Sequence, residues 1–150
     1  IEPPKDLYAV VVVPDFHLST SAARDVLPAT FSKKDAVHNM GHVALLVWSM
    51  INNDLKLMGK MMEGDKLHQP FRKKLVPGME KVFLAAKKTG AYGVALSGAG
   101  PSIIAFCNKE SSLKIGEKMV SEFNKENINC SFKVVIPSVH GAQVIKKAEQ

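Results

Sequence analysis

The sequence has few cysteines and no long apolar run, and both shortages exclude a class of protein. Its 150 residues contain two cysteines, Cys107 and Cys130. Both lie in or beside apolar, strand-like runs, which fits a reducing compartment better than a disulfide framework. The longest apolar run is far shorter than the roughly 18 residues of a membrane span, and no signal peptide is visible. We therefore expect a cytoplasmic protein without a membrane partner.

Two further absences concern nucleotides and metals. Neither G-x-x-x-x-G-K-[ST] nor G-x-G-x-x-G occurs, so the chain has no recognisable ATP-binding loop of its own. His38 and His42 are four positions apart in "HNMGH", but position 39 is Asn where a zinc protease motif has Glu. Because no Cys or carboxylate cluster completes a ligand set, we predict no metal site.

Arginine is the scarce residue that points to a function. The formal net charge is +6, and 18 of the 20 basic residues are Lys, leaving only Arg24 and Arg72. The lysines are scattered and no stripe of aromatic residues and arginines accompanies them, which argues against nucleic acid as a partner. The guanidinium fork suits a carboxylate or phosphate better than Lys does. The residues alone leave two interpretations open, an anion clamp or a surface ion pair such as Arg24 with Asp25.

Helices are predicted where apolar residues recur every three or four positions. The longest covers about 33–51 and begins at a variant capping box, Ser32 followed by Asp35. Its pattern predicts one buried face, made of Val37, Met40, Val43, Ala44, Val47, Met50 and Ile51. Further helices are expected from Ser19, Thr20 or Ser21 to Val26, after Asn53 or Asp54, over 79–89 before Gly90, and over 111–128 with Leu113, Met119, Val120 and Phe123 on the apolar face.

Strands are predicted at 7–14, 94–96, 102–106, 130–137 and 140–147. The segment 63–78 contains prolines and glycines and reads as an irregular connection with one helical turn. The helices are segregated from most strands and the strand connections are short. This order predicts a single α+β domain over 1–150, with an antiparallel sheet and helices on one face.

The segment "GAYGVALSGAGPSIIAF", residues 90–106, interrupts two apolar strands with a turn that contains Ser97, Gly98, Ala99 and Gly100. Glycine permits positive φ and close approach of another backbone. For a glycine turn taken alone, an ordinary hairpin connection is the commoner explanation. Ser97 is not set in a G-x-S-x-G motif, so a serine hydrolase is not expected.

Taken together, these segments resemble a family of small-molecule kinases named after galactokinase, homoserine kinase, mevalonate kinase and phosphomevalonate kinase (GHMP). The glycine turn resembles the third signature of that family. The segments "VVVPDFHLSTSAARDVLP", "DAVHNMGHVALLV" and "DKLHQPFRKKLVPG" resemble the homoserine kinases within it. The resemblance covers about residues 7–145.

The resemblance implies a ferredoxin-like C-terminal domain whose glycine turn faces an N-terminal domain that carries the ATP loop. Neither that loop nor that domain is found in this sequence, and residue 1 is Ile, so we expect a piece of a longer enzyme that is inactive alone. Arg24 and Arg72 match the positions that hold the homoserine carboxylate, and Ser97, Gly98, Ala99 and Gly100 match the active-site turn. ATP and Mg²⁺ would be bound mainly by the missing domain. No residue matches a catalytic base.

The implied reaction is transfer of the γ-phosphoryl group of ATP to the side-chain hydroxyl of L-homoserine, a step toward threonine. Two alternatives stay open: another kinase of the same superfamily, and a non-enzymatic module that binds an amino acid and regulates another protein. Expected partners are L-homoserine, the N-terminal domain and, since dimers are common in the family, a second copy of the chain.

Overall fold

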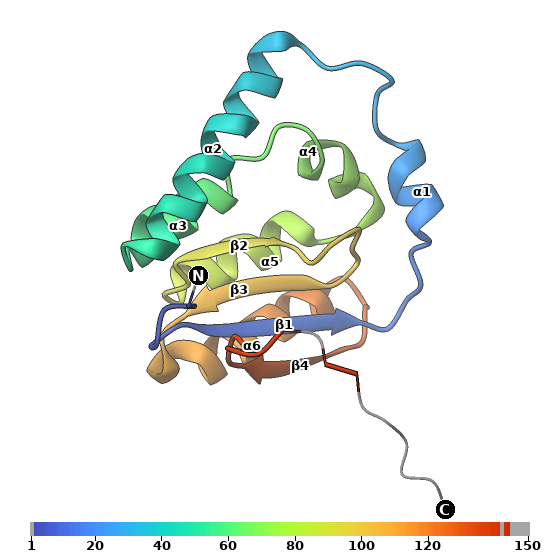
Figure 1. The fold of residues 1–150 in the computed structure, drawn as a ribbon. Helices are drawn as coiled ribbons and strands as arrows, with labels where there is room; N and C mark the ends of the chain where they lie inside the picture. The colour runs from blue at the N-terminus through green and yellow to red at the C-terminus, as the bar shows by residue number, and fades with distance from the viewer. Residues whose placement is uncertain (1, 142, 145–150) are drawn as a thin grey trace, which may run out of the picture.

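The fold is built on a four-stranded antiparallel sheet. The structure is a computed structural model that describes residues 2–141, 143 and 144 (Figure 1). The strands are β1 (Tyr8–Pro14), β2 (Gly93–Leu96), β3 (Ile103–Cys107) and β4 (Cys130–Val135), in the spatial order β2-β3-β1-β4. Val10 pairs with Ala105 of β3 on one side and with Val134 of β4 on the other.

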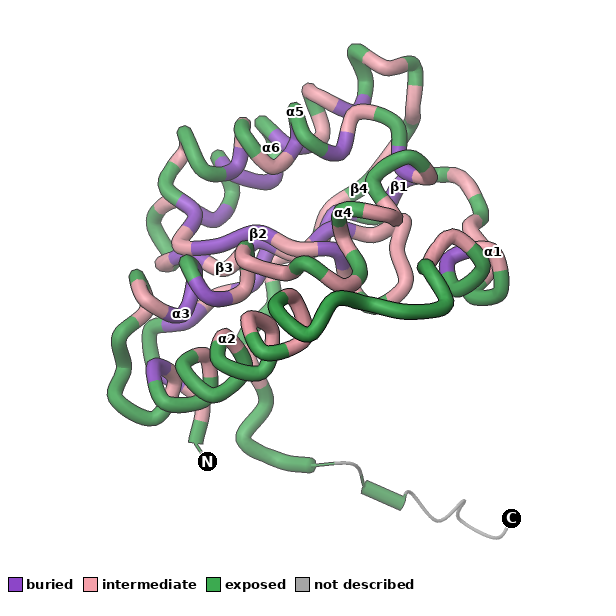
Figure 2. The backbone as a smooth tube through the Cα atoms, turned by 90° about the horizontal axis from the view of Figure 1, so that it is seen from above, coloured by how far each residue is buried: buried purple, intermediate pink, exposed green. Residues whose placement is uncertain are grey.

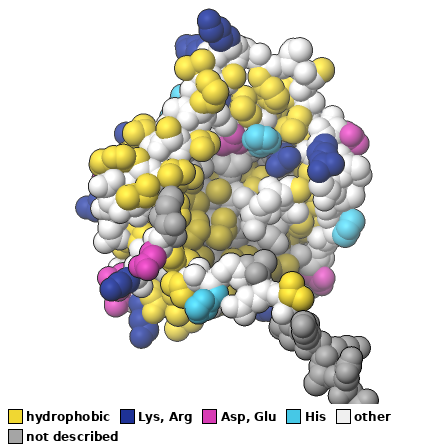
Figure 3. Space-filling view, in the orientation of Figure 1, with side chains coloured by type: hydrophobic (Ala, Val, Ile, Leu, Met, Phe, Trp, Pro, Cys, Tyr) yellow, Lys and Arg dark blue, Asp and Glu magenta, His cyan; other side chains and the backbone are white. Residues whose placement is uncertain are grey.

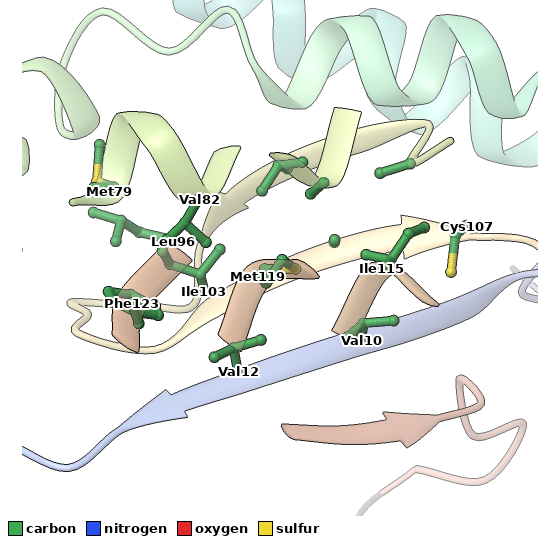
Figure 4. Close-up of a cluster of buried hydrophobic side chains, with 14 of the residues drawn as sticks. Val10, Val12, Met79, Val82, Leu96, Ile103, Cys107, Ile115, Met119 and Phe123 are labelled. Carbon is green, nitrogen blue, oxygen red and sulfur yellow. The ribbon is translucent and has the colours of Figure 1, made fainter. Parts of the chain in front are cut away.

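Two helices cover one face of this sheet. They are α5 (Met79–Lys88) and α6 (Lys109–Lys125), and with the strands they complete a βαββαβ arrangement of the ferredoxin-like type. Alternate strand residues point into the core, as expected from the period of two along a strand. Val10, Val12 and Ile103 are fully buried against Ile115, Met119 and Phe123 of α6 (Figure 4). The predicted α+β class and antiparallel sheet are confirmed.

Four further helices lie between β1 and α5. They are α1 (Thr20–Asp25), α2 (Lys33–Ile51), α3 (Leu55–Met62) and α4 (Gln69–Arg72), and α4 continues into a 3₁₀ turn at Lys73–Leu75. α3 packs against the edge strand β2, and α2 packs on α3. Figure 2 shows α5 and α6 on one side of the sheet and α2 on the other. Among the described residues, no helix is long and apolar enough to cross a membrane.

The starts of these helices follow local sequence signals. Ser19 accepts a hydrogen bond from the Ala22 amide and is the N-cap of α1. Ser32 accepts from the Asp35 amide at 3.0 Å, which confirms it as the N-cap of α2. The Asp35 carboxylate accepts from the Ser32 hydroxyl at 2.6 Å, whereas in a standard capping box it would accept from the Ser32 amide. Asp54, rather than Asn53, is the N-cap of α3. Gly90 follows α5 with a φ of +111°, as predicted for a glycine that ends a helix.

The predicted buried face of α2 is wrong. Met40 is 65% exposed and Val43 is 59% exposed, and Val37, Val47, Trp48 and Ile51 are exposed as well (Figure 2). The periodicity identified the apolar positions correctly, but α3 covers only one side of α2. An apolar stripe at helical spacing therefore does not by itself show that the same chain covers it.

Two smaller expectations also differ from the structure. Leu113 is 63% exposed, whereas Met119 and Phe123 are buried and Val120 is half-buried. Leu113 therefore points away from the sheet, and the buried positions of α6 are Ser112, Ile115, Gly116, Met119 and Phe123. Of the last predicted strand, 140–147, the residues 140, 141, 143 and 144 belong to no strand, and 142 and 145–147 lie outside the described residues.

Candidate functional site

A cleft of about 530 Å³ lies where α1, α4 and the end of β2 meet. Both arginines of the sequence line it, although they come from different segments of the chain. The lining residues are Thr20, Arg24, Asp65, His68, Gln69, Arg72, Ala95, Leu96, Gly98 and Ala99. The fold therefore brings the two predicted anion-binding residues to the same place as the glycine turn.

The glycine turn closes one wall of this cleft. Gly98 and Gly100 have φ values of +63° and +89°, which favour glycine over residues with a side chain. The amide of Ser97 donates to the Ser102 carbonyl at 2.8 Å, and the Gly100 amide donates to the Ser97 carbonyl at 3.2 Å. Gly98 and Ala99 line the cleft, whereas Ser97 and Gly100 are not among the lining residues. The turn thus presents backbone, with little side chain, to the cleft.

Arg72 is held in place by two backbone carbonyls. Its Nε donates to the carbonyl of Ala23 in α1 at 3.0 Å, and its Nη1 donates to the carbonyl of Gly98 at 3.3 Å. The guanidinium therefore joins α1 to the glycine turn. A guanidinium group has five N–H groups, and Arg72 uses two of them in these bonds. Three therefore stay available for a ligand.

Neither arginine forms an ion pair with an acidic residue that the structure describes, and Arg24 is not paired with Asp25. The surface-pair interpretation therefore gains no support from this arrangement. Two guanidinium groups in one cleft, without a paired carboxylate, make a site suited to an anion with two oxygens.

Asp65 organises the loop that precedes α4. Its carboxylate accepts hydrogen bonds from the amides of Leu67, His68 and Gln69 and from the Asn39 side chain in α2. Burial by itself raises the pKa of Asp65, but the hydrogen bonds from Gln69, Asn39, Leu67 and His68 outweigh it and hold the pKa below its ordinary value. Asp65 is therefore a carboxylate whose charge is stabilised by its neighbours.

Gln69 links α4 to the edge of the sheet. Its Oε1 accepts a hydrogen bond from the Leu96 amide at 2.9 Å, and Glu63 likewise accepts one from the Val94 amide at 3.2 Å. Unpaired amides on an edge strand need partners, and here side chains from the 63–69 segment supply them. These two hydrogen bonds fix β2, whose Ala95 and Leu96 line the cleft, relative to the segment that carries Arg72.

The polar lining residues that sequence reasoning missed are Thr20, Asp65, His68 and Gln69. All four lie within the segments "STSAAR" and "DKLHQPFR", so their closeness in sequence to the two arginines was the available signal. His38 and His42 stack with ring centroids 3.9 Å apart, and both rings are hydrogen-bonded to backbone carbonyls. Over residues 2–141, 143 and 144, no three His, Cys, Asp or Glu side chains form a group that could hold a metal ion.

Comparison with protein families assigns the class. The family model described as GHMP kinases C terminal matches residues 46–126, more than half of the chain. The chain therefore belongs to the GHMP kinase C-terminal family, and the resemblance seen in the sequence is confirmed.

Within that family, the relatives it resembles are homoserine kinases. It is 47% identical over 145 residues to the homoserine kinase of Moorella thermoacetica, a match covering 97% of this chain and 48% of that protein. It is 39% identical over 137 residues to the enzyme of Desulfitobacterium hafniense, covering 91% of this chain and 46% of that protein. The chain thus spans about half the length of the curated relatives it matches.

Solved structures agree with this relationship. A crystal structure of homoserine kinase from Cytophaga hutchinsonii superposes with a TM-score of 0.87 at 36% identity, covering 91% of this chain and 43% of that one. A mevalonate kinase from L. major, solved with R-mevalonate, has a TM-score of 0.58 at 21% identity and covers 89% of this chain and 44% of that one. The second match shows that the two proteins share the fold.

Proposed function

We propose that this chain is the substrate-binding half of a homoserine kinase, an enzyme that transfers the γ-phosphoryl group of ATP to the side-chain hydroxyl of L-homoserine. The observation that carries the proposal is the shared cleft of Arg24 and Arg72. Homoserine has a carboxylate at one end and the reacting hydroxyl at the other. A site that grips the carboxylate therefore fixes where the hydroxyl lies.

Each arginine has a distinct part in this proposal. Arg72 is immobilised by the carbonyls of Ala23 and Gly98, so little side-chain entropy remains to be lost when it binds a carboxylate. Arg24, on α1, lines the same cleft and supplies the second guanidinium. Phosphoryl transfer depends mostly on positioning and charge stabilisation, and holding the carboxylate contributes the positioning of the acceptor.

The residues of this chain do not fit a magnesium–nucleotide site by themselves. The glycine turn connects two strands and so lacks the helix N-terminus that commonly receives a phosphate. No acidic cluster suitable for Mg²⁺ is found within the part of the chain that the structure describes. We therefore assign ATP and Mg²⁺ to a second domain outside this chain and derive no step through them.

The exposed face of α2 supports a two-domain enzyme. Residues 36–51 contain no Lys, Arg, Asp or Glu, yet Met40, Val43 and Trp48 are exposed. Figure 3 shows hydrophobic side chains gathered at the surface over the region of α2. Soluble proteins rarely leave a contiguous apolar helix face to water, so such a face marks an interface. Because the relatives are about twice as long, we assign this face to contact with the other half of the enzyme. A homodimer and a cytoplasmic location remain predictions.

A substrate screen tests the proposed function. The full-length enzyme that contains this chain is expected to phosphorylate L-homoserine in preference to mevalonate, and the 150-residue chain alone is expected to show no turnover. Preference for mevalonate would favour the other superfamily kinases. A folded full-length protein that binds homoserine but phosphorylates neither compound would favour the regulatory module.

A further inference from the structure

Asp65 faces the same cleft as the two arginines, but its carboxylate is already saturated. Four donors reach it within 3.0 Å: Asn39 Nδ2 at 2.7 Å, and the amides of Leu67, His68 and Gln69 at 3.0, 2.9 and 2.6 Å. A carboxylate offers about four lone-pair sites, so none remains for the ammonium group of an amino-acid substrate. The side chain is only 17% exposed, which agrees with this accounting.

We infer that Asp65 is the positioning residue for Arg72, an inference that rests on the proposed function. The helix that carries Arg72 is α4, which has four residues and no hydrogen bond from the side chain of its N-cap, His68. A single helical turn is unstable alone because its first amides lack partners. Asp65 supplies a charged acceptor to three consecutive amides that lead into this turn: those of Leu67 and His68, which precede α4, and that of Gln69, its first residue.

The effect of Asp65 reaches the cleft through the two ends of α4. At the first position, Gln69 accepts from the Leu96 amide, which ties α4 to β2. At the last position, Arg72 donates to Ala23 and Gly98. If the start of α4 loosens, the guanidinium loses its fixed distance from Arg24. Asp65 therefore acts on the substrate through Arg72, without touching it.

Asn39 anchors this arrangement to α2. Its Nδ2 donates to Asp65, and its Oδ1 accepts from the Lys66 amide at 2.9 Å. The neighbouring His38 is hydrogen-bonded through Nε2 to the Gly64 carbonyl at 2.8 Å. Side chains of α2, the helix with the exposed apolar face, therefore anchor the segment 64–66 that leads into α4 and Arg72.

Kinetics of the full-length enzyme test the inference. Asp65→Asn should lower kcat/KM for homoserine about tenfold, the effect of losing one hydrogen bond to a charged group. The loss should appear mainly in the KM for homoserine, with the KM for ATP unchanged. The matched control is Asp54→Asn, the same change at the start of α3, outside the cleft, where Asn still serves as an N-cap. It should leave both KM values within twofold.

A double-mutant cycle separates positioning from general damage. In an Arg72→Ala background, Asp65→Asn should cause no further loss of kcat/KM for homoserine, because its effect passes through the missing side chain. A further tenfold loss in that background would overturn the inference, as would unchanged kinetics of Asp65→Asn alone. Asn39→Ala, which removes one donor only, should move the KM for homoserine in the same direction if Asp65→Asn fails to fold.

A second readout does not depend on kinase activity. The 150-residue chain has only two arginines, so its NMR spectrum contains two Nε–H signals. The signal of Arg72, identified by its loss in Arg72→Lys, should exchange slowly because Nε–H is bonded to Ala23. Asp65→Asn should speed that exchange, and Asp54→Asn should not. Unchanged exchange in Asp65→Asn would overturn the inference, whereas absence of homoserine kinase activity would count against the proposed function only.

Discussion

Two glycines in helix interiors should respond in opposite ways to the same substitution. A Cβ added at Gly59 of α3 would overlap the carbonyl of Tyr92 and lie 2.7 Å from the Gly93 amide nitrogen, whereas a Cβ at Gly41 of α2 meets nothing within 4 Å. Gly→Ala within a helix normally stabilises by about 1 kcal/mol. At Gly59 the obstacles are backbone atoms that cannot rotate away, so α3 must move off β2. Overpacking costs about 3 kcal/mol at the upper end of its usual range. Because the helix gains about 1 kcal/mol from the change to Ala, Gly59→Ala should lower the free energy of unfolding by about 2 kcal/mol.

Thermal and urea unfolding of the 150-residue chain measure this contrast. Gly59→Ala should lower Tm by about 4–8 °C, and Gly41→Ala should raise it by about 2–4 °C, given about 2–4 °C per kcal/mol at this size. Both variants should keep the wild-type urea m-value. Equal stabilisation by the two substitutions would refute the close crossing of α3 and β2. That crossing also sets the position of α2, and with it the Asn39–Asp65 hydrogen bond.

Two further predictions use other parts of the structure. Because the folded pKa of Asp65 is lowered, its contribution to stability should be complete above the ordinary value of 3.8 and lost as the pH falls through the folded value. The gap in unfolding free energy between wild type and Asp65→Asn should therefore be constant near neutral pH and shrink below about pH 4; a gap that widens on acidification would contradict this. Val43→Glu should leave the isolated chain's unfolding free energy within about 0.5 kcal/mol but impair assembly of the full-length enzyme, whereas equal behaviour of both proteins would exclude α2 from the interface.

Local features of the fold were predictable from the sequence because their causes are local. The caps Ser19, Ser32 and Asp54 and the stop at Gly90 each depend on residues within one helical turn. The bounds of α2 followed from such signals. Its burial did not, because burial depends on what lies beside the helix, and α3 covers only part of it.

The site was predictable in the same uneven way. Arg24 and Arg72 stood out because a chain rich in Lys uses Arg only there, and the family resemblance gave them a shared place. The structure brings both into one cleft. Asp65 was missed because three of its four close partners are backbone amides, which every sequence supplies. No apolar periodicity marks the four-residue helix α4, so its start offered no position at which to expect a capping Asp.

The central claim is that Arg24 and Arg72 hold the homoserine carboxylate, and steady-state kinetics of the full-length enzyme test it most directly. Hydrogen bonds to charged groups contribute about 1.5–3 kcal/mol, so Arg24→Ala or Arg72→Ala should each lower kcat/KM for homoserine roughly 10- to 150-fold. Most of the loss should lie in the KM for homoserine, the KM for ATP should not change, and Arg72→Lys should recover only part of the loss because a point charge lacks the guanidinium fork. Alanine variants that remain folded by circular dichroism and keep wild-type homoserine kinetics would contradict this claim and favour the interpretation of both arginines as surface residues.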